Sequence, residues 1–115
     1  MVPIVERAVI IATDADILNG TRLNAIPYNG VLTFMVLADL SNATNSWSMT
    51  IQLPNGDVPV DSQIVPGSNP SLGGVLDDRQ FFMMSFAAHQ GGHFNISLVE
   101  TGTAIATWQA VLKPA

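Results

Sequence analysis

The chain has no cysteine and few charged residues. Without Cys among its 115 residues, it can form neither a disulfide framework nor a cysteine-based zinc site, and it has no thiol nucleophile. Charged residues make up 11% of the chain, against roughly 25% in typical globular proteins. The cations are Arg7, Arg22, Arg79 and Lys113, and they are scattered. Because nucleic-acid binding needs clustered Lys and Arg, the sequence excludes that role.

Long hydrophobic segments are also lacking. The longest apolar runs, around residues 31–38 and 81–88, are far shorter than the ~18 residues of a membrane-spanning helix. Glu6 and Arg7 interrupt the apolar residues at the start of the chain, and no basic leader precedes them. We therefore expect neither a membrane span nor a secretory signal peptide. The length suits a single core, so residues 1–115 are predicted to form one domain.

Uncharged polar residues take the place of charge. The chain is rich in Ser, Thr, Asn, Gln and Gly, its hydrophobic fraction is 48% and its net charge is −5. Charge normally keeps a free protein apart from its neighbours. Low charge combined with a positive mean hydropathy indicates a surface covered by neighbouring molecules, or one exposed outside a cell.

Alternating apolar residues dominate the last third of the chain and predict three strands. The inward sets are Phe82, Met84, Phe86 and Ala88; then Phe94, Ile96 and Leu98; then Ala104, Ala106, Trp108, Ala110 and Leu112. Two three-residue loops, Gln90–Gly92 and Glu100–Gly102, each end in glycine, which suits the left-handed position of such hairpins. The pattern predicts an antiparallel meander that pairs Ala88 with Phe94 and Phe94 with Trp108.

The first third predicts further strands. Residues Ile4–Ala12 are predicted to form the first strand, and Pro3 favours an edge position, so 1–12 is an edge strand or an N-terminal arm. A turn at Asn19-Gly20 predicts a short strand over Thr21–Ile26. Val31–Leu40 is apolar on both faces and is predicted to be central.

The middle of the chain alternates cleanly and then becomes irregular. Ser46–Leu53 alternates with Trp47 among its inward residues. A turn at Pro54–Asp57 leads to a short edge strand at Val58–Val60, and a long loop is expected over Ser62–Asp78. With seven or eight strands and little or no helix, the fold class is all-β: an antiparallel β-sandwich, immunoglobulin-like or jelly-roll.

Two groups of residues contain side chains of the types that bind metal ions. His89 and His93 are predicted to face each other across the first hairpin of the meander, but a zinc site needs three or four protein ligands and no further ligand is evident in the sequence. Asp14, Asp16 and Asn19 resemble a fragment of a calcium loop, yet their spacing fails the helix–loop–helix pattern. We interpret the histidines as an exposed cross-strand pair, and the Asp and Asn residues as turn formers.

No catalytic, cofactor-binding or metal-binding residue is assigned. The chain contains no Gly-x-Ser-x-Gly elbow and no glycine-rich phosphate loop, so we expect it not to be an enzyme. Trp47 and Trp108 lie in the inward phase of their strands and are predicted to be core residues. Tyr28 lies in a turn and is the one of these three rings expected to be exposed, which is little support for a carbohydrate site.

The outward faces of the strands are unusually apolar. Phe81, Met83, Val99, Ile105 and Val111 are predicted to point away from the core. A sheet that faces water normally alternates to polar residues there, and surplus apolar surface marks a contact site. The leading hypothesis is a structural protein that packs against copies of itself, as a dimer or trimer, or against a larger assembly. The alternative is a ligand-binding β-sandwich module for carbohydrate or a host surface.

The chain is short, cysteine-free and rich in Asn, Thr, Ala and Gly, with an apolar leading arm, MVPIVERAVIIA, and a closing strand, GTAIATWQAVL. In this general character it resembles the small β-sandwich decoration, or cement, proteins of tailed bacteriophage capsids. The resemblance implies homotrimers on the capsid exterior of a virion, bound to a major capsid protein that they help to stabilise. The arm and the Ser62–Asp78 loop would then be the shell contacts.

Overall fold

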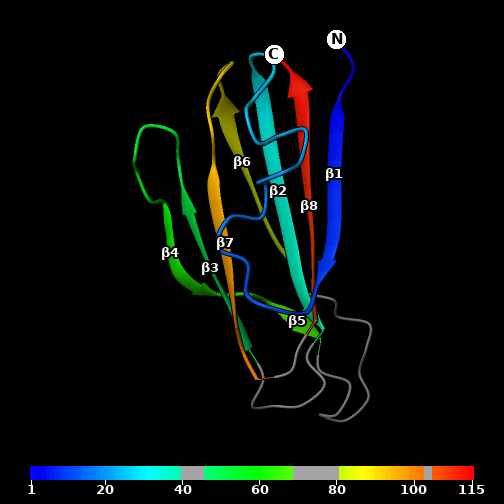
Figure 1. Ribbon diagram of the computed structural model, residues 1–115, viewed down its shortest axis with the longest axis vertical. Coiled ribbons are helices and arrows are strands. Elements are labelled where there is room, and N and C mark those ends of the chain that lie inside the picture. Colours follow the sequence, from blue (N-terminus) through cyan, green and yellow to red (C-terminus); the bar gives the residue numbers. More distant parts are fainter. Residues whose placement is uncertain (40–45, 69–80, 103–104) are drawn as a thin grey trace.

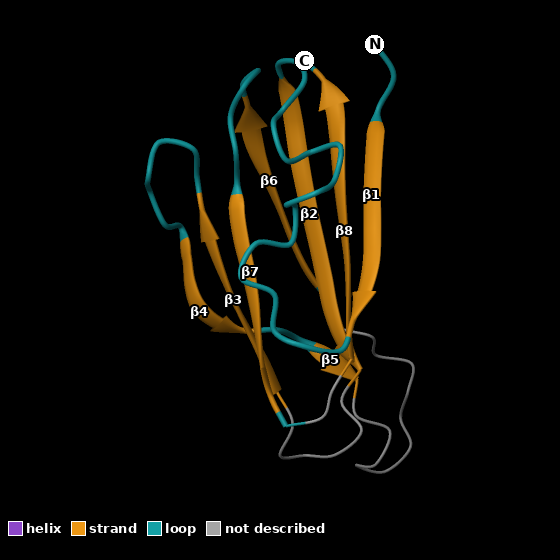
Figure 2. Ribbon diagram, in the orientation of Figure 1, coloured by secondary structure: helices purple, strands orange, loops and turns teal. Residues whose placement is uncertain are grey.

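The computed structural model describes residues 1–39, 46–68, 81–102 and 105–115, which form a sandwich of two β-sheets (Figures 1 and 2). No helix occurs in these residues. The strands are β1 (Ile4–Ile10), β2 (Gly30–Asp39), β3 (Ser46–Gln52), β4 (Val60–Ile64), β5 (Gly67–Ser68), β6 (Phe82–Ala88), β7 (Asn95–Thr101) and β8 (Ile105–Pro114). The all-β sandwich expected from the sequence is confirmed.

The first sheet, sheet A, has the order β1-β8-β2, with β6 on the other side of β2. These pairings are antiparallel; Val5 lies opposite Val111, Thr33 opposite Val111 and Ser85 opposite Thr33. The short β5 pairs in parallel with the end of β2. Glycine is required at Gly30 because a Cβ there would lie 2.0 Å from the carbonyl oxygen of Lys113.

The second sheet, sheet B, has the order β4-β3-β7, and all its pairings are antiparallel. Strand β3 alternates without error, with Trp47, Met49 and Ile51 buried, as predicted. The turn expected at Pro54–Asp57 is present, with Gly56 at a φ of 94°. The edge strand that follows begins at Val60 rather than Val58, so β4 extends into the predicted Ser62–Asp78 loop.

The strand order identifies the topology as jelly-roll rather than immunoglobulin-like. The first strand pairs with the last, β8, and the chain crosses between sheets at β6, β7 and β8. An immunoglobulin fold instead pairs its last two strands within one sheet. In a full jelly roll of eight strands a further strand follows the first and pairs with the strand equivalent to β7. Here residues 11–29 take its place.

Residues 11–29 close one side of the sandwich without forming a strand, so the strand predicted at Thr21–Ile26 is wrong. Its backbone meets the edge of β7 at a few points: Asp14 exchanges two 2.9 Å hydrogen bonds with Leu98, and Ile17 donates to Ile96. The segment runs across the sandwich from the end of β1 to the start of β2 (Figure 1), and several of its side chains belong to the hydrophobic core. The buried ones are Ile17, Leu18, Leu23, Ile26 and Tyr28.

The predicted C-terminal meander is also wrong. Strand β6 pairs with β2, β7 with β3, and β8 with β1 and β2, so no two of these three consecutive strands are neighbours. The glycine turns join different sheets: the positive φ falls at Gly91 in the first and at Gly102 in the second. The predicted inward phase is correct for β7 and for the described part of β8: Ile96, Leu98, Ala106, Trp108, Ala110 and Leu112 are buried.

Strand β6 follows the predicted inward phase only in part, because sheet B does not extend far enough to cover it. Ala88 is buried and Phe82 and Phe86 are half-buried, but Met84 is exposed. Of the other expectations, β1 is an edge strand and β2 is central, as predicted. Most of the expected Ser62–Asp78 loop, residues 69–78, lies outside the described residues.

Candidate interaction surface

The outer face of sheet A, which points away from sheet B, is mostly apolar across all four long strands. The register places its residues in rows, such as Val5, Val111, Thr33 and Ser85, or Val9, Thr107 and Leu37. Large hydrophobic side chains are exposed on it or beside it, as predicted from the sequence for three of them, Phe81, Met83 and Ile105. The exposed set is Val5, Val9, Val31, Phe81, Met83 and Ile105.

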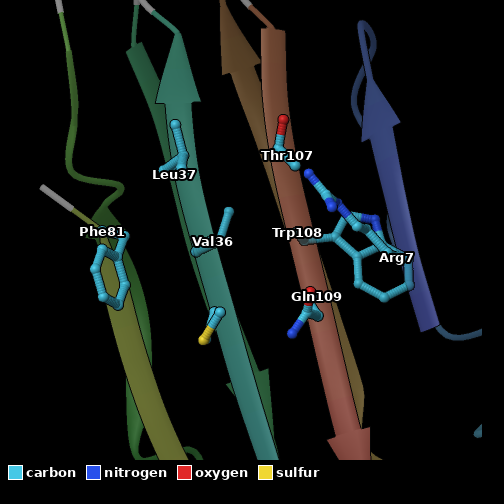
Figure 3. Close-up of a pocket in the computed structure, with 8 residues that line it drawn as sticks. Arg7, Val36, Leu37, Phe81, Thr107, Trp108 and Gln109 are labelled. Atoms are coloured by element: carbon cyan, nitrogen blue, oxygen red, sulfur yellow. The ribbon is translucent and has the colours of Figure 1, made fainter. Parts of the chain in front are cut away.

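A shallow hollow of about 210 Å³ lies near the centre of this face. Figure 3 shows Phe81 at one end, beside β6, and Arg7 of β1 at the other. The side chains and backbone between them belong to β2 and β8. The residues that line the hollow are Arg7, Met35, Val36, Leu37, Phe81, Thr107, Trp108 and Gln109.

Among the described residues that line this hollow, Arg7 is the one that carries a charge. It is exposed, in line with Val5 and Val9 on the outward side of β1. The neighbouring groups that carry hydrogen-bonding capacity, Thr107 and Gln109, are uncharged. A guanidinium keeps its charge under all ordinary conditions, so anything that covers the hollow must accept hydrogen bonds from it or leave it with water.

A second cavity, of about 480 Å³, lies where sheet B fails to cover β6. It is lined on the β6 side by Phe86 and on the opposite side by Leu53 and Pro54, with His89 also part of its wall. The rings of Phe86 and Phe94 are 5.7 Å apart between centroids. The volume is in the range of small-molecule sites, and the lining is mainly apolar.

The two histidines do not face each other across a hairpin, so the predicted cross-strand pair is wrong. His93 instead holds residues 11–29 against the start of β7: its Nδ1 lies 2.5 Å from the carbonyl oxygen of Asn24 and its Nε2 lies 2.8 Å from Asp16 Oδ2. Both partners are acceptors, and the charged form of the ring, with two N–H donors, satisfies both.

The two acidic residues within 11–29 have structural roles: Asp14 stabilises a turn, and Asp16 contacts His93. Asp14 Oδ1 accepts a 3.0 Å hydrogen bond from the Asp16 amide, which is the turn-forming role expected for it. Asn19 is exposed. Among the residues that the structure describes, no group of three or more His, Cys, Asp or Glu side chains is placed to hold a metal ion.

The aromatic side chains are placed partly as expected. Trp47 and Trp108 are core residues, as predicted. Tyr28 is not exposed: it is 8% accessible, and its hydroxyl lies 2.8 Å from the carbonyl oxygen of Val2 and 3.1 Å from that of Leu112. The ring therefore fastens the start of the chain to β8. The turn composition at 27–30 gave no sign of this long-range contact.

Strand β4 carries a feature that the sequence did not indicate. Ser62 has a φ of 51°, a left-handed conformation that is uncommon for a residue other than glycine and carries strain. The register shifts at this point between Met49 and Ile51 of β3, and the Ser62 amide donates to the Thr50 hydroxyl instead of to a backbone carbonyl. As a result four successive side chains, Asp61 to Ile64, are exposed.

Comparisons with known proteins add little to this description. Neither a protein-family model nor a curated protein matches the sequence. One solved structure with a similar fold is the CBM22-1 xylan-binding domain from Paenibacillus barcinonensis Xyn10C. It shares 16% identity with this chain, over 99% of this chain and 87% of that one, at a TM-score of 0.39. No helix in the described part of the chain could cross a membrane.

Proposed function

We propose that this chain is a structural assembly protein whose working surface is the outer face of sheet A. The observation that supports this most directly is the exposure of large hydrophobic side chains on a sheet face that the described residues of a single copy leave uncovered. Met83 is 57% exposed and Val9 is 61% exposed. Contiguous apolar surface of this kind is rare on a free monomer and typical of interaction sites.

The size of the face supports the same role. Strands spaced ~4.8 Å apart and rising ~3.3 Å per residue give the four long strands an area of roughly 500 to 600 Å². A stable interface buries about 800 Å² on each partner. The face would supply most of one partner's share, with the rest drawn from surrounding residues.

Within this role, a capsid decoration protein is the specific function we propose. Such a protein binds a shell of repeated subunits through broad contacts and needs no catalytic group. The low charge and the exposed apolar face suit a molecule that functions while bound to neighbouring subunits. Copies would associate with one another, with a trimer favoured, and with a major capsid protein on the outside of a virion.

Sedimentation velocity over a wide protein concentration range tests the assembly role. The wild-type chain is expected to form a discrete oligomer, and Met83→Gln is expected to shift it to smaller species because it places a polar group in the apolar face. Val99→Gln is the matched control, since Val99 is 44% exposed but lies on the outer face of sheet B. A wild-type chain that stays monomeric at all concentrations would refute the proposal.

The second candidate function, a ligand-binding module, rests on the cavity beside His89. Its volume of about 480 Å³ could hold a small ligand or one sugar residue. Titration of a panel of oligosaccharides, followed by chemical shifts of Phe86 and Gly92, would reveal binding there. A monomeric chain with saturable shifts at these residues would favour the module over the assembly protein.

A further inference from the structure

The hollow on sheet A and the bulged edge of β4 are complementary in charge and polarity. The hollow has apolar walls and a single cation, Arg7. The β4 edge presents the carboxylate of Asp61 and the apolar side chain of Ile64, which is 63% exposed. One surface offers five guanidinium N–H donors, and the other offers two carboxylate acceptors.

Asp61 is more available than several other carboxylates. Glu6 forms an ion pair with Arg22, Asp16 contacts His93, and Asp57 accepts a 3.1 Å hydrogen bond from Asn55. Asp61 is exposed, and the hydroxyl of its neighbour Ser62 lies 3.2 Å from its Oδ1. That contact leaves acceptor positions on both oxygens free, since a carboxylate can accept about four hydrogen bonds.

The strain at Ser62 bears on the same surface. A left-handed residue other than glycine in a strand is strained and tends to persist where it has a use. Here its effect is to break the alternation of β4, so that Asp61 and Ile64 are both exposed at the free edge of sheet B. A regular strand would have turned one of these two side chains toward the core, because residues three apart alternate in direction.

We propose that the hollow around Arg7 receives the β4 edge of a second copy, with Arg7 paired to that copy's Asp61 and the apolar walls covering Ile64. A covered Arg7 without a partner would be costly, because a buried charge needs a counter-charge or hydrogen bonds. The two surfaces lie on different parts of one copy: β4 and β1 are on opposite sides of the molecule in Figure 1.

This contact is heterologous, because each copy gives one surface and receives the other. Such contacts build a closed ring when the rotation between copies closes, and an open filament when it does not. The inference rests on the proposed assembly role and names the partner of the sheet A face: the edge of β4 in another copy of this chain.

A charge-swap series tests the pairing. Arg7→Glu and Asp61→Arg are each expected to weaken self-association at least about tenfold, since each places two like charges together in a covered contact. The double variant Arg7→Glu/Asp61→Arg restores an opposite pair and is expected to return association to within about threefold of wild type. Sedimentation velocity measures the association constant of each.

The control is Lys113→Glu, which makes the same change of charge at an exposed cation at the end of the same face. It is expected to leave association nearly unchanged. Circular dichroism of each variant establishes that it is folded, which is expected because both substituted side chains are exposed. Failure of the double variant to recover, while the wild type associates, would overturn the Arg7–Asp61 contact but leave the assembly role intact. A monomeric wild type would overturn both.

Discussion

Tyr28 shows how much one side chain contributes to the closure of this fold. Its hydroxyl lies within hydrogen-bond distance of carbonyl oxygens on both Val2 and Leu112, so it joins residues from the two ends of the described chain. We expect Tyr28→Phe to lower the free energy of unfolding by about 1 kcal/mol, the net value of a typical hydrogen bond. Urea denaturation followed by tryptophan fluorescence measures it.

A suitable control for that experiment is Thr33→Val. The Thr33 hydroxyl lies 2.8 Å from that of Ser85 on the exposed side of sheet A, where water can replace the lost partner in a single copy, so both variants are compared at a protein concentration too low for association. Its removal is expected to cost less than Tyr28→Phe. An equal or larger loss for Thr33→Val would show that the Tyr28 hydroxyl does not hold the start of the chain.

His93 is the second residue whose role depends on distant partners. Removing its ring in His93→Ala would release both the Asp16 carboxylate and the Asn24 carbonyl. We expect a loss of about 1 to 2 kcal/mol, toward the lower end because both side chains are partly exposed. Hydrogen exchange should accelerate at the Asp14 and Leu98 amides. Unchanged exchange there would contradict the proposed clamp.

At the scale of elements, residues 11–29 are predicted to be as important to stability as a strand. Leu23 is fully buried between the sheets, although its segment has no regular structure. We expect Leu23→Ala to cost about 2 to 5 kcal/mol, the range for a buried leucine. Val99→Ala, at an exposed position, should cost far less. Thermal unfolding of the two variants would separate them, and similar losses would mean that the segment is only loosely packed.

The sequence predicted the positions of the strands better than it predicted which strands pair with one another. Alternation showed which residues of β3, β7 and β8 point inward, because burial on one face leaves a period of two. It could not show which sheet a strand joins, since the interior of a sandwich accepts apolar side chains from both sides. The glycine turn at Gln90–Gly92 fits a hairpin and a crossover between sheets equally well, and the crossover is what the structure has.

The candidate surface was predicted in outline only. The outward positions of Phe81, Met83 and Ile105 were correct, because they follow from the phase of their strands. The hollow beside Arg7 could not be predicted, since it depends on β1, β8 and β2 lying side by side. Nor could the strained Ser62, because Ser gives no sign of a left-handed conformation in sequence.

For the whole molecule, association should appear as stability that depends on concentration. Assembly draws the unfolding equilibrium toward the folded state by mass action. We expect the melting temperature of the wild type to rise by several degrees over an approximately hundredfold range of concentration. The same measurement on Met83→Gln should give a flatter dependence. Identical slopes for both would argue against the outer face of sheet A as the interface.

The position of β8 between β1 and β2 has a consequence for synthesis of the chain. Sheet A stays split until its last strand arrives, since β1 and β2 do not pair with each other. Translation proceeds at ~5–20 residues per second, so residues 40–104 keep the growing polypeptide in this state for several seconds. The edges of β1 and β2 that later pair with β8 are then unpaired and accessible to other nascent chains. We therefore expect chaperones bound at the ribosome to improve the yield of this protein in cells.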